Sequence, residues 1–78
     1  MKMTQYFQAT RLRKDRAIIR EEWIEYVISN PFRETLQADG RIRRWASIKE
    51  FDGSYLRVIL FSDGATVHNA FFDRSFKP

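Results

Sequence analysis

Hydrophobic residues follow a helical period in the first part of the chain. Ile19, Trp23 and Val27 recur at four-residue intervals, and glutamates occupy the opposite flank. This spacing is typical of an amphipathic helix with one buried side. Pro31 should end the helix, because proline cannot continue it and disfavours helical geometry at the preceding residue. The pattern therefore predicts one main helix over about residues 19-30.

After the proline, the pattern changes to strand-like alternation. Three Asp-Gly pairs, at 39–40, 52–53 and 63–64, separate segments rich in aromatic and β-branched residues. Asp-Gly favours tight hairpins, since a type I′ turn needs positive φ at both central residues, which glycine accepts and aspartate tolerates. The sequence thus predicts an α+β fold in which a four-stranded antiparallel β-meander packs on the main helix. The expected strands are 32–37, 42–51, 55–61 and 65–72.

The two ends of the chain carry weaker patterns. Tyr6 and Phe7 indicate either a short additional N-terminal strand or an extended arm, and residues 11–16 either a turn or a single helical turn. Near the C-terminus, Phe76 is expected to fold back onto the core. No linker or internal repeat divides the chain, so residues 1–78 should form a single domain.

Composition narrows the classes of protein. Hydrophobic residues make up 44% of the chain and aromatic residues 15%, which favours a packed globular domain over disorder. Zero cysteines exclude a disulfide scaffold and thiolate metal sites, and a single histidine argues against structural zinc, so no metal or cofactor is expected. No apolar segment approaches membrane-spanning length, which predicts a cytoplasmic protein without membrane contact.

Charge is distributed unevenly along the chain. Residues 1–20 hold six Lys and Arg residues and a single Asp, a net +5, whereas residues 21–78 hold eight basic and nine acidic residues, a net −1. A basic N-terminal segment is suited to nucleic acid or to an acidic partner protein. The simpler interpretation is a solvated charged segment.

A strand register follows if each Asp-Gly is a two-residue loop. Phe51 then lies opposite Ser54, and Ser62 opposite Ala65. Because side chains alternate between the two faces of a sheet, one face becomes almost entirely apolar and should receive the helix. Its expected members are Trp45, Leu56, Val58, Leu60, Val67 and Phe71. The other face is mixed, and the single helix leaves it largely open.

The mixed face carries the candidate chemistry. In this register it brings together Glu50, Arg57 and His68, with Arg44 and Tyr55 nearby. Ribonucleases that cleave through the 2′-hydroxyl need a base, an acid and a cation that stabilises the phosphate, and these three side chains can supply them without a metal. The alternative is a solvent-facing surface in which Glu50 forms a cross-strand ion pair with Arg57 and His68 has no special role.

Three stretches carry a resemblance to a known family. They are Asp-Gly-Arg-Ile-Arg-Arg-Trp at 39–45, Tyr-Leu-Arg-Val-Ile-Leu at 55–60, and Asp-Gly-Ala-Thr-Val-His-Asn-Ala-Phe-Phe-Asp-Arg at 63–74. They resemble an uncharacterised family of short bacterial proteins, which is distantly similar to the RelE/ParE and BrnT toxins of type II toxin–antitoxin modules. The resemblance implies a compact sheet with helices on one side, an RNA-cleaving surface on the sheet, and an antitoxin protein that covers it.

The leading functional hypothesis is accordingly a toxin-like, metal-independent RNA endonuclease. Glu50 would act as general base, His68 as general acid and Arg57 as phosphate clamp, and the first two roles can be exchanged. The residues expected to contact RNA are Arg11, Arg13, Arg16, Arg44 and Tyr55. The alternative is a non-catalytic module for protein interaction or self-association, which would form a homodimer through a sheet edge or the open face. A DNA-binding accessory protein is a weaker third option.

Overall fold

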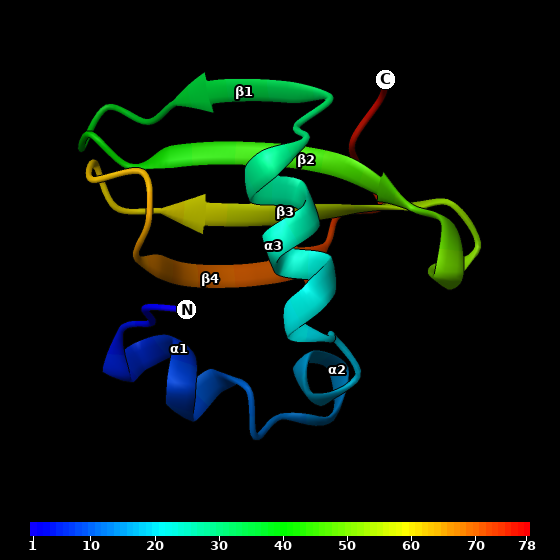
Figure 1. Cartoon of the computed structure of the whole chain (residues 1–78), viewed down its shortest axis with the longest axis horizontal. Coiled ribbons are helices and arrows are strands. Elements are labelled where there is room, and N and C mark those ends of the chain that lie inside the picture. Colours follow the sequence, from blue (N-terminus) through cyan, green and yellow to red (C-terminus); the bar gives the residue numbers. More distant parts are fainter.

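The computed structural model describes all residues from Met1 to Pro78 and has the α+β architecture that the sequence predicts, with a four-stranded antiparallel sheet. Three short helices precede the sheet, and neighbouring strands follow one another along the chain in the order β1-β2-β3-β4 (Figure 1). The elements are α1 (Gln5–Thr10), α2 (Lys14–Ala17), α3 (Glu21–Ser29), β1 (Arg33–Leu36), β2 (Ile42–Ile48), the 3₁₀ turn η1 (Lys49–Phe51), β3 (Ser54–Leu60) and β4 (Val67–Phe72).

Helix α3 lies against β2 and β3 and crosses the sheet (Figure 1). Glu21 and Glu22 stand in its first turn, where negative charge interacts favourably with the helix dipole. The helix ends at Asn30, whose N–H still donates to the Tyr26 carbonyl, immediately before Pro31. The helix is thus slightly shorter than the predicted span, and the proline defines its C-terminal boundary.

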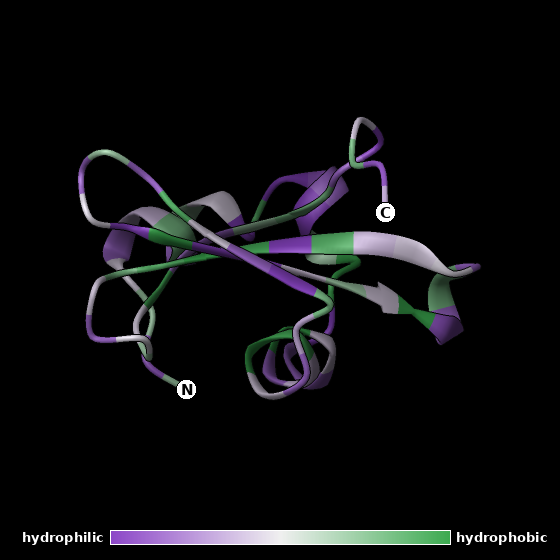
Figure 2. Ribbon diagram, turned by 90° about the horizontal axis from the view of Figure 1, so that it is seen from above, coloured by the Kyte–Doolittle hydropathy of each residue, from purple (hydrophilic) through white to green (hydrophobic).

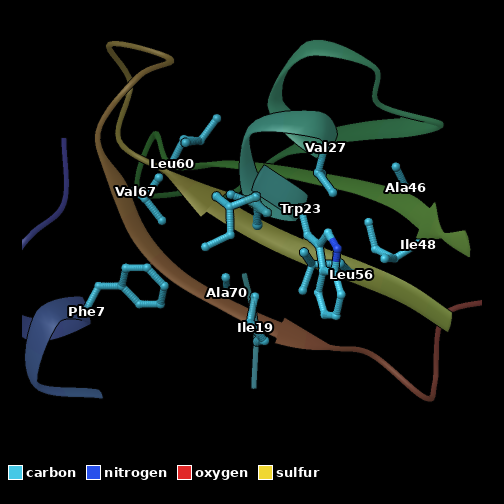
Figure 3. Close-up of a cluster of buried hydrophobic side chains, with 12 residues drawn as sticks. Phe7, Ile19, Trp23, Val27, Ala46, Ile48, Leu56, Leu60, Val67 and Ala70 are labelled. Carbon is cyan, nitrogen blue, oxygen red and sulfur yellow. The ribbon is translucent and has the colours of Figure 1, made fainter. Parts of the chain in front are cut away.

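The hydrophobic core lies between the helices and one face of the sheet, which we call the core face. On β3 this face carries Leu56, Val58 and Leu60, all fully buried. Helix α3 contributes Trp23 and Val27 from above, as Figure 3 shows. The remaining buried members of the core are Phe7, Ile19, Ile24, Ala46, Ile48, Val67 and Ala70.

The N-terminal segment forms a helix where a strand or arm was expected. Tyr6 and Phe7 belong to α1, whose N-cap residue Thr4 accepts the Phe7 N–H through its hydroxyl oxygen at 3.1 Å. Thr4 is among the residue types that favour this capping role, and Phe7 enters the core. Only Met3 pairs with the sheet, through one parallel bridge to Val67. Farther along, α2 is a single helical turn, one of the two alternatives for this region.

The predicted register between β2 and β3 is wrong by three residues. Ile48, and not Phe51, stands near Ser54, because residues 49–51 leave the sheet as the turn η1. Asp52 and Gly53 follow it with φ values of 58° and 72°, a left-handed pair that closes the loop. An odd shift moves every side chain of β2 to the opposite face relative to β3. Ala46 and Ile48 therefore lie in the core, where the expected register placed Trp45.

At the other two Asp-Gly loops the aspartates do not have positive φ, so these loops are not type I′ turns. Each aspartate accepts backbone N–H groups within its loop instead. Asp63 accepts the hydroxyl of Thr66 at 2.6 Å and the N–H groups of Thr66 and Ala65. These hydrogen bonds, led by the Thr66 hydroxyl, lower the pKa of Asp63 to about 2.

A bulge in β4 is the second reason why the observed faces of the sheet differ from the predicted ones. Leu60 pairs with Val67 as expected, but Ile59 pairs with Asn69, so His68 is the additional residue. Phe71 consequently stands opposite Arg57, on the face away from α3. We call this the open face; on β3 it carries Tyr55, Arg57 and Ile59.

Candidate nucleic-acid interface

A ladder of alternating aromatic rings and guanidinium groups crosses the open face. The register aligns Trp45 of β2, Arg57 of β3 and Phe71 of β4 in one row. The Arg57 guanidinium carbon lies 5.4 Å from the Trp45 ring centroid and 5.2 Å from that of Phe71. Arg16 of α2 extends the row, with its guanidinium 5.2 Å from the Phe71 ring. These distances are within the range of cation–π attraction, and we call the four residues the cation–π ladder.

Asp73 anchors one end of the ladder. Its Oδ2 accepts the indole N–H of Trp45 at 3.0 Å and lies 3.6 Å from Arg57 Nη1, while Oδ1 accepts the backbone N–H and hydroxyl of Ser75. Burial alone would raise the pKa of Asp73, but the hydrogen bonds from Trp45 and Ser75 and the charge of Arg57 outweigh it and lower the pKa. The carboxylate is therefore ionised at neutral pH.

Three arginines of the open face have unused hydrogen-bonding capacity. The Nε atoms of Arg16, Arg43 and Arg57 are buried and have no hydrogen-bond partner. Arg16 Nη1 does donate to Asn69 Oδ1 at 2.7 Å, which fixes that side chain over β4. Arg16 Nε lies 3.3 Å from Asp15 Oδ2, close enough for an ion pair but without hydrogen-bond geometry.

The C-terminal segment covers part of this face. Phe76 stacks on Trp45 with 5.1 Å between ring centroids and contacts Tyr55 at 4.7 Å. Arg33 holds the segment down, because its guanidinium lies over the Phe76 ring and donates to the Lys77 carbonyl. Phe76 thus folds back onto the open face, while the expected position was the core. In Figure 2 the C-terminus and α3 lie on opposite sides of the sheet.

A pocket of about 510 Å³ adjoins the ladder where β3 begins and β4 ends. Helix α2 and the C-terminal segment form its other walls. Its volume is within the range of small-molecule sites, and apolar side chains predominate among the residues that line it. The lining residues are Asp15, Ile18, Phe51, Ser54, Tyr55, Phe71, Phe72, Asp73, Arg74 and Phe76.

The structure does not bring Glu50, Arg57 and His68 together. Arg57 is the centre of the ladder, but Glu50 belongs to η1 and lines a separate pocket of about 380 Å³ with Trp23 and Tyr26 of α3. The expectation that all three share one face is wrong because it depended on the two-residue loop at Asp52-Gly53. The alternative ion pair between Glu50 and Arg57 is absent for the same reason, and Arg57 pairs with Asp73.

His68 lies at the hairpin end of the open face, in a stack of rings. Its imidazole is 5.0 Å from the Tyr6 ring and 5.2 Å from the Phe61 ring, with Nδ1 3.2 Å from Thr4 Oγ1. Burial and the nearby charge of Arg41 lower the pKa of His68 below its usual range. The imidazole is therefore neutral at pH 7.

The five residues expected to contact RNA divide between the two sides of the sheet. Tyr55 and Arg16 lie on or beside the open face. Arg44 does not, because it donates to Glu34 at 2.6 Å and to the Ile28 carbonyl on the side of α3. Arg11 binds the Ile19 carbonyl and stacks on Phe7, which is a structural role.

Arg13, the fifth of these residues, is largely exposed at the start of α2, with Nε 4.0 Å from Asp15. Sequence reasoning missed Arg43, Asp73 and the aromatic partners of Arg57. The signal for the aromatic partners, which the incorrect register concealed, is the cross-strand row of Trp45, Arg57 and Phe71.

The chain matches no protein-family model, and neither a curated protein nor a solved structure is significantly similar to it. None of the helices has the length and apolar composition needed to cross a membrane. Nowhere do three His, Asp or Glu side chains converge as metal ligands would.

Proposed function

We propose that this protein binds single-stranded RNA on the open face of its sheet. The observation that carries the proposal is the cation–π ladder, in which aromatic rings hold the partly exposed guanidinium groups of Arg57 and Arg16 in place. Arginine binds phosphate through several donors in a planar arrangement. A preorganised guanidinium loses less conformational entropy when it binds.

The remainder of the face supports the same ligand. Arg33, Arg41 and Arg43 add positive charge, and Phe32 and Phe61 are substantially exposed rings close to arginine side chains. Unpaired bases stack on aromatic and guanidinium planes, while Lys and Arg follow the phosphate backbone. A sheet face with both features is suited to an unpaired strand, whose bases are accessible, more than to a duplex.

The test is fluorescence anisotropy with a labelled single-stranded RNA at several salt concentrations. Arg57→Gln should weaken binding about tenfold and reduce the slope of log affinity against log salt by about one, as expected when one phosphate contact is lost. Arg20→Gln, an exposed arginine at the start of α3, is the matched control and should change little. Equal losses in both variants would indicate a nonspecific charge effect and contradict the proposal.

Cleavage of the bound RNA, the activity that the toxin resemblance implies, is a second candidate. The observation that favours it is His68, a neutral imidazole on the open face beside Arg41, which in the exchanged role could act as general base. Glu50 has no place in this version because η1 holds it beside α3. Messenger RNA should be cut by the wild type, alone or with ribosomes, and left intact by His68→Ala. Intact RNA with folded wild-type protein would leave binding as the only activity.

The non-catalytic alternative, protein interaction, would use a different surface from the open face. Strand β1 pairs only with β2, so its outer edge is free to accept a strand from an antitoxin or from a second copy. Leu36 on this edge is 69% exposed and Phe32 before it 57%. A stable complex in light scattering that Leu36→Lys dissolves would support this function; a monomer that forms no such complex would exclude it.

A further inference from the structure

We propose that the pocket beside the ladder accepts one unpaired nucleobase of the bound RNA and prefers guanine. This inference rests on the proposed function, since the pocket is continuous with the same face: Phe71 is both a member of the ladder and part of the pocket wall. A strand that follows the arginines would therefore pass the mouth of the pocket.

The walls are suited to a flat, aromatic ligand. Tyr55, Phe71 and Phe76 line the pocket, together with Ile18, which caps the C-terminus of α2. Each of these aromatic residues is only partly buried, so ring surface is available for stacking. Base–aromatic stacking contributes to the binding of every base, so the walls alone explain affinity but not base preference.

The preference follows from the carboxylates. Of the two aspartates that line the pocket, Asp73 already receives hydrogen bonds from Trp45 and Ser75 on its two oxygens. Asp15 receives no hydrogen bond. Its partners are Arg16 Nε at 3.3 Å and Arg13 Nε at 4.0 Å, and its side chain is 65% exposed. Asp15 is therefore the acceptor that a base in the pocket can still use.

A carboxylate with free lone pairs selects adjacent N–H donors. Guanine presents two on its Watson–Crick edge, N1–H and the N2 amino group, which a carboxylate accepts in parallel. Inosine retains only N1–H, and adenine places the unprotonated N1 beside its amino group. The expected order of affinity is guanine, then inosine, then adenine, with guanine about tenfold above adenine, within the discrimination of a bidentate contact.

Arg16 and Arg74 complete the arrangement. Arg16 belongs to the ladder and also lies beside Asp15, so it can orient the carboxylate while it remains fixed to Asn69. Arg74 is exposed on the rim, where it can meet the phosphate of the inserted nucleotide. The pocket thus has a stacking wall, a base-reading acid and a cation at its mouth.

The experiment measures the affinity of short uridine oligomers that carry one central guanosine, inosine or adenosine. Wild type should follow the order above, and Asp15→Asn should bind guanosine no better than inosine, because the amide offers a single acceptor. Glu25→Gln removes the same charge from α3, away from the pocket, and should retain the preference.

Two outcomes would overturn the inference while the proposed function stands: equal binding of all three oligomers, or a guanosine preference that Asp15→Asn retains. Absence of binding to every oligomer would instead contradict the proposed function itself, and the inference with it.

Discussion

The core face and the open face of the sheet are made by alternate residues of the same strands, but they are constructed differently. On β3, Leu56, Val58 and Leu60 point to the core face and are completely buried against the helices. Their neighbours Arg57 and Ile59 point to the open face and are only partly covered. The core face buries apolar side chains away from water, and the open face holds charged groups in fixed positions between aromatic rings.

This difference separates what stabilises the fold from what is available to a ligand. An apolar side chain gains most from complete burial, whereas a guanidinium needs hydrogen-bonding partners. Arg57 has a single ion-pair partner in Asp73, and its Nε has none. Substitutions on the core face should therefore have the largest effect on stability, and only substitutions on the open face should also change RNA binding. The predictions that follow test this division.

The largest effect is expected from shortening a side chain of the core face. Leu56→Ala should lower the free energy of unfolding by about 2–5 kcal/mol, through lost burial and the cavity that remains. Ile59→Ala, on the open face of the same strand, is the matched control and should cost about 1 kcal/mol, near the median for point mutations. Urea denaturation measures both. Similar losses would mean that the open face is packed like a core.

The next effect is expected at the anchor of the ladder. Trp45→Phe retains a ring but removes the indole N–H that donates to the Asp73 carboxylate at 3.0 Å. Hydrogen bonds to charged groups contribute about 1.5–3 kcal/mol, so stability should fall by about 2 kcal/mol. Loss of this hydrogen bond should also raise the pKa of Asp73, which an NMR titration measures. Trp23→Phe is the matched control, because it keeps Trp45 and its hydrogen bond to Asp73, so the pKa of Asp73 should stay low. An unchanged Asp73 pKa in Trp45→Phe would contradict this role.

Arg57→Lys keeps the charge but removes the planar group that lies between Trp45 and Phe71. RNA affinity should fall several-fold because lysine neither stacks flat nor binds phosphate through two parallel donors. Stability should fall by about 1 kcal/mol, the scale of a partly exposed cation–π contact. If lysine supports full RNA affinity, charge alone accounts for binding and the ladder has no special part in it.

The smallest effect concerns pH. Because the pKa of His68 is lowered in the folded protein, the unfolded chain binds more protons around pH 6, so stability should decrease as the pH falls below about 6.5. His68→Gln should make the unfolding free energy less dependent on pH between 7 and 5. The Asp63 carboxyl, with its pKa near 2, loses its contribution only at lower pH, between about 4 and 2. An identical slope in His68→Gln would remove His68 as the cause.

The part of the fold that could be predicted is the part that depends on spacing within one element. The alternation of Leu56, Val58 and Leu60 assigns these side chains to a single face whatever the neighbouring strands do. Register between strands depends on the loops, and the residues of η1 continue the strand-like pattern of β2 although they form a 3₁₀ turn. Nothing in the composition of residues 49–51 separates the two conformations.

The candidate site was accordingly predictable only in part. Arg57 was identified because its position on β3 needs no register, and Arg16 because it belongs to the basic N-terminal segment. Glu50 was placed on the wrong side because its position required the loop to be short. Trp45 is buried as expected, but by Phe76, a contact between distant parts of the chain.

The two tryptophans allow the most direct test of RNA binding on the open face. Trp45 lies on that face, and Trp23 lies beneath α3 against the core face. In a ¹H–¹⁵N NMR titration with a single-stranded RNA, the indole N–H signal of Trp45 and the Nε–Hε signal of Arg57 should shift, while the Trp23 indole remains unchanged. Movement of the Trp23 signal without the Trp45 signal, or no movement at saturating RNA, would contradict the proposal.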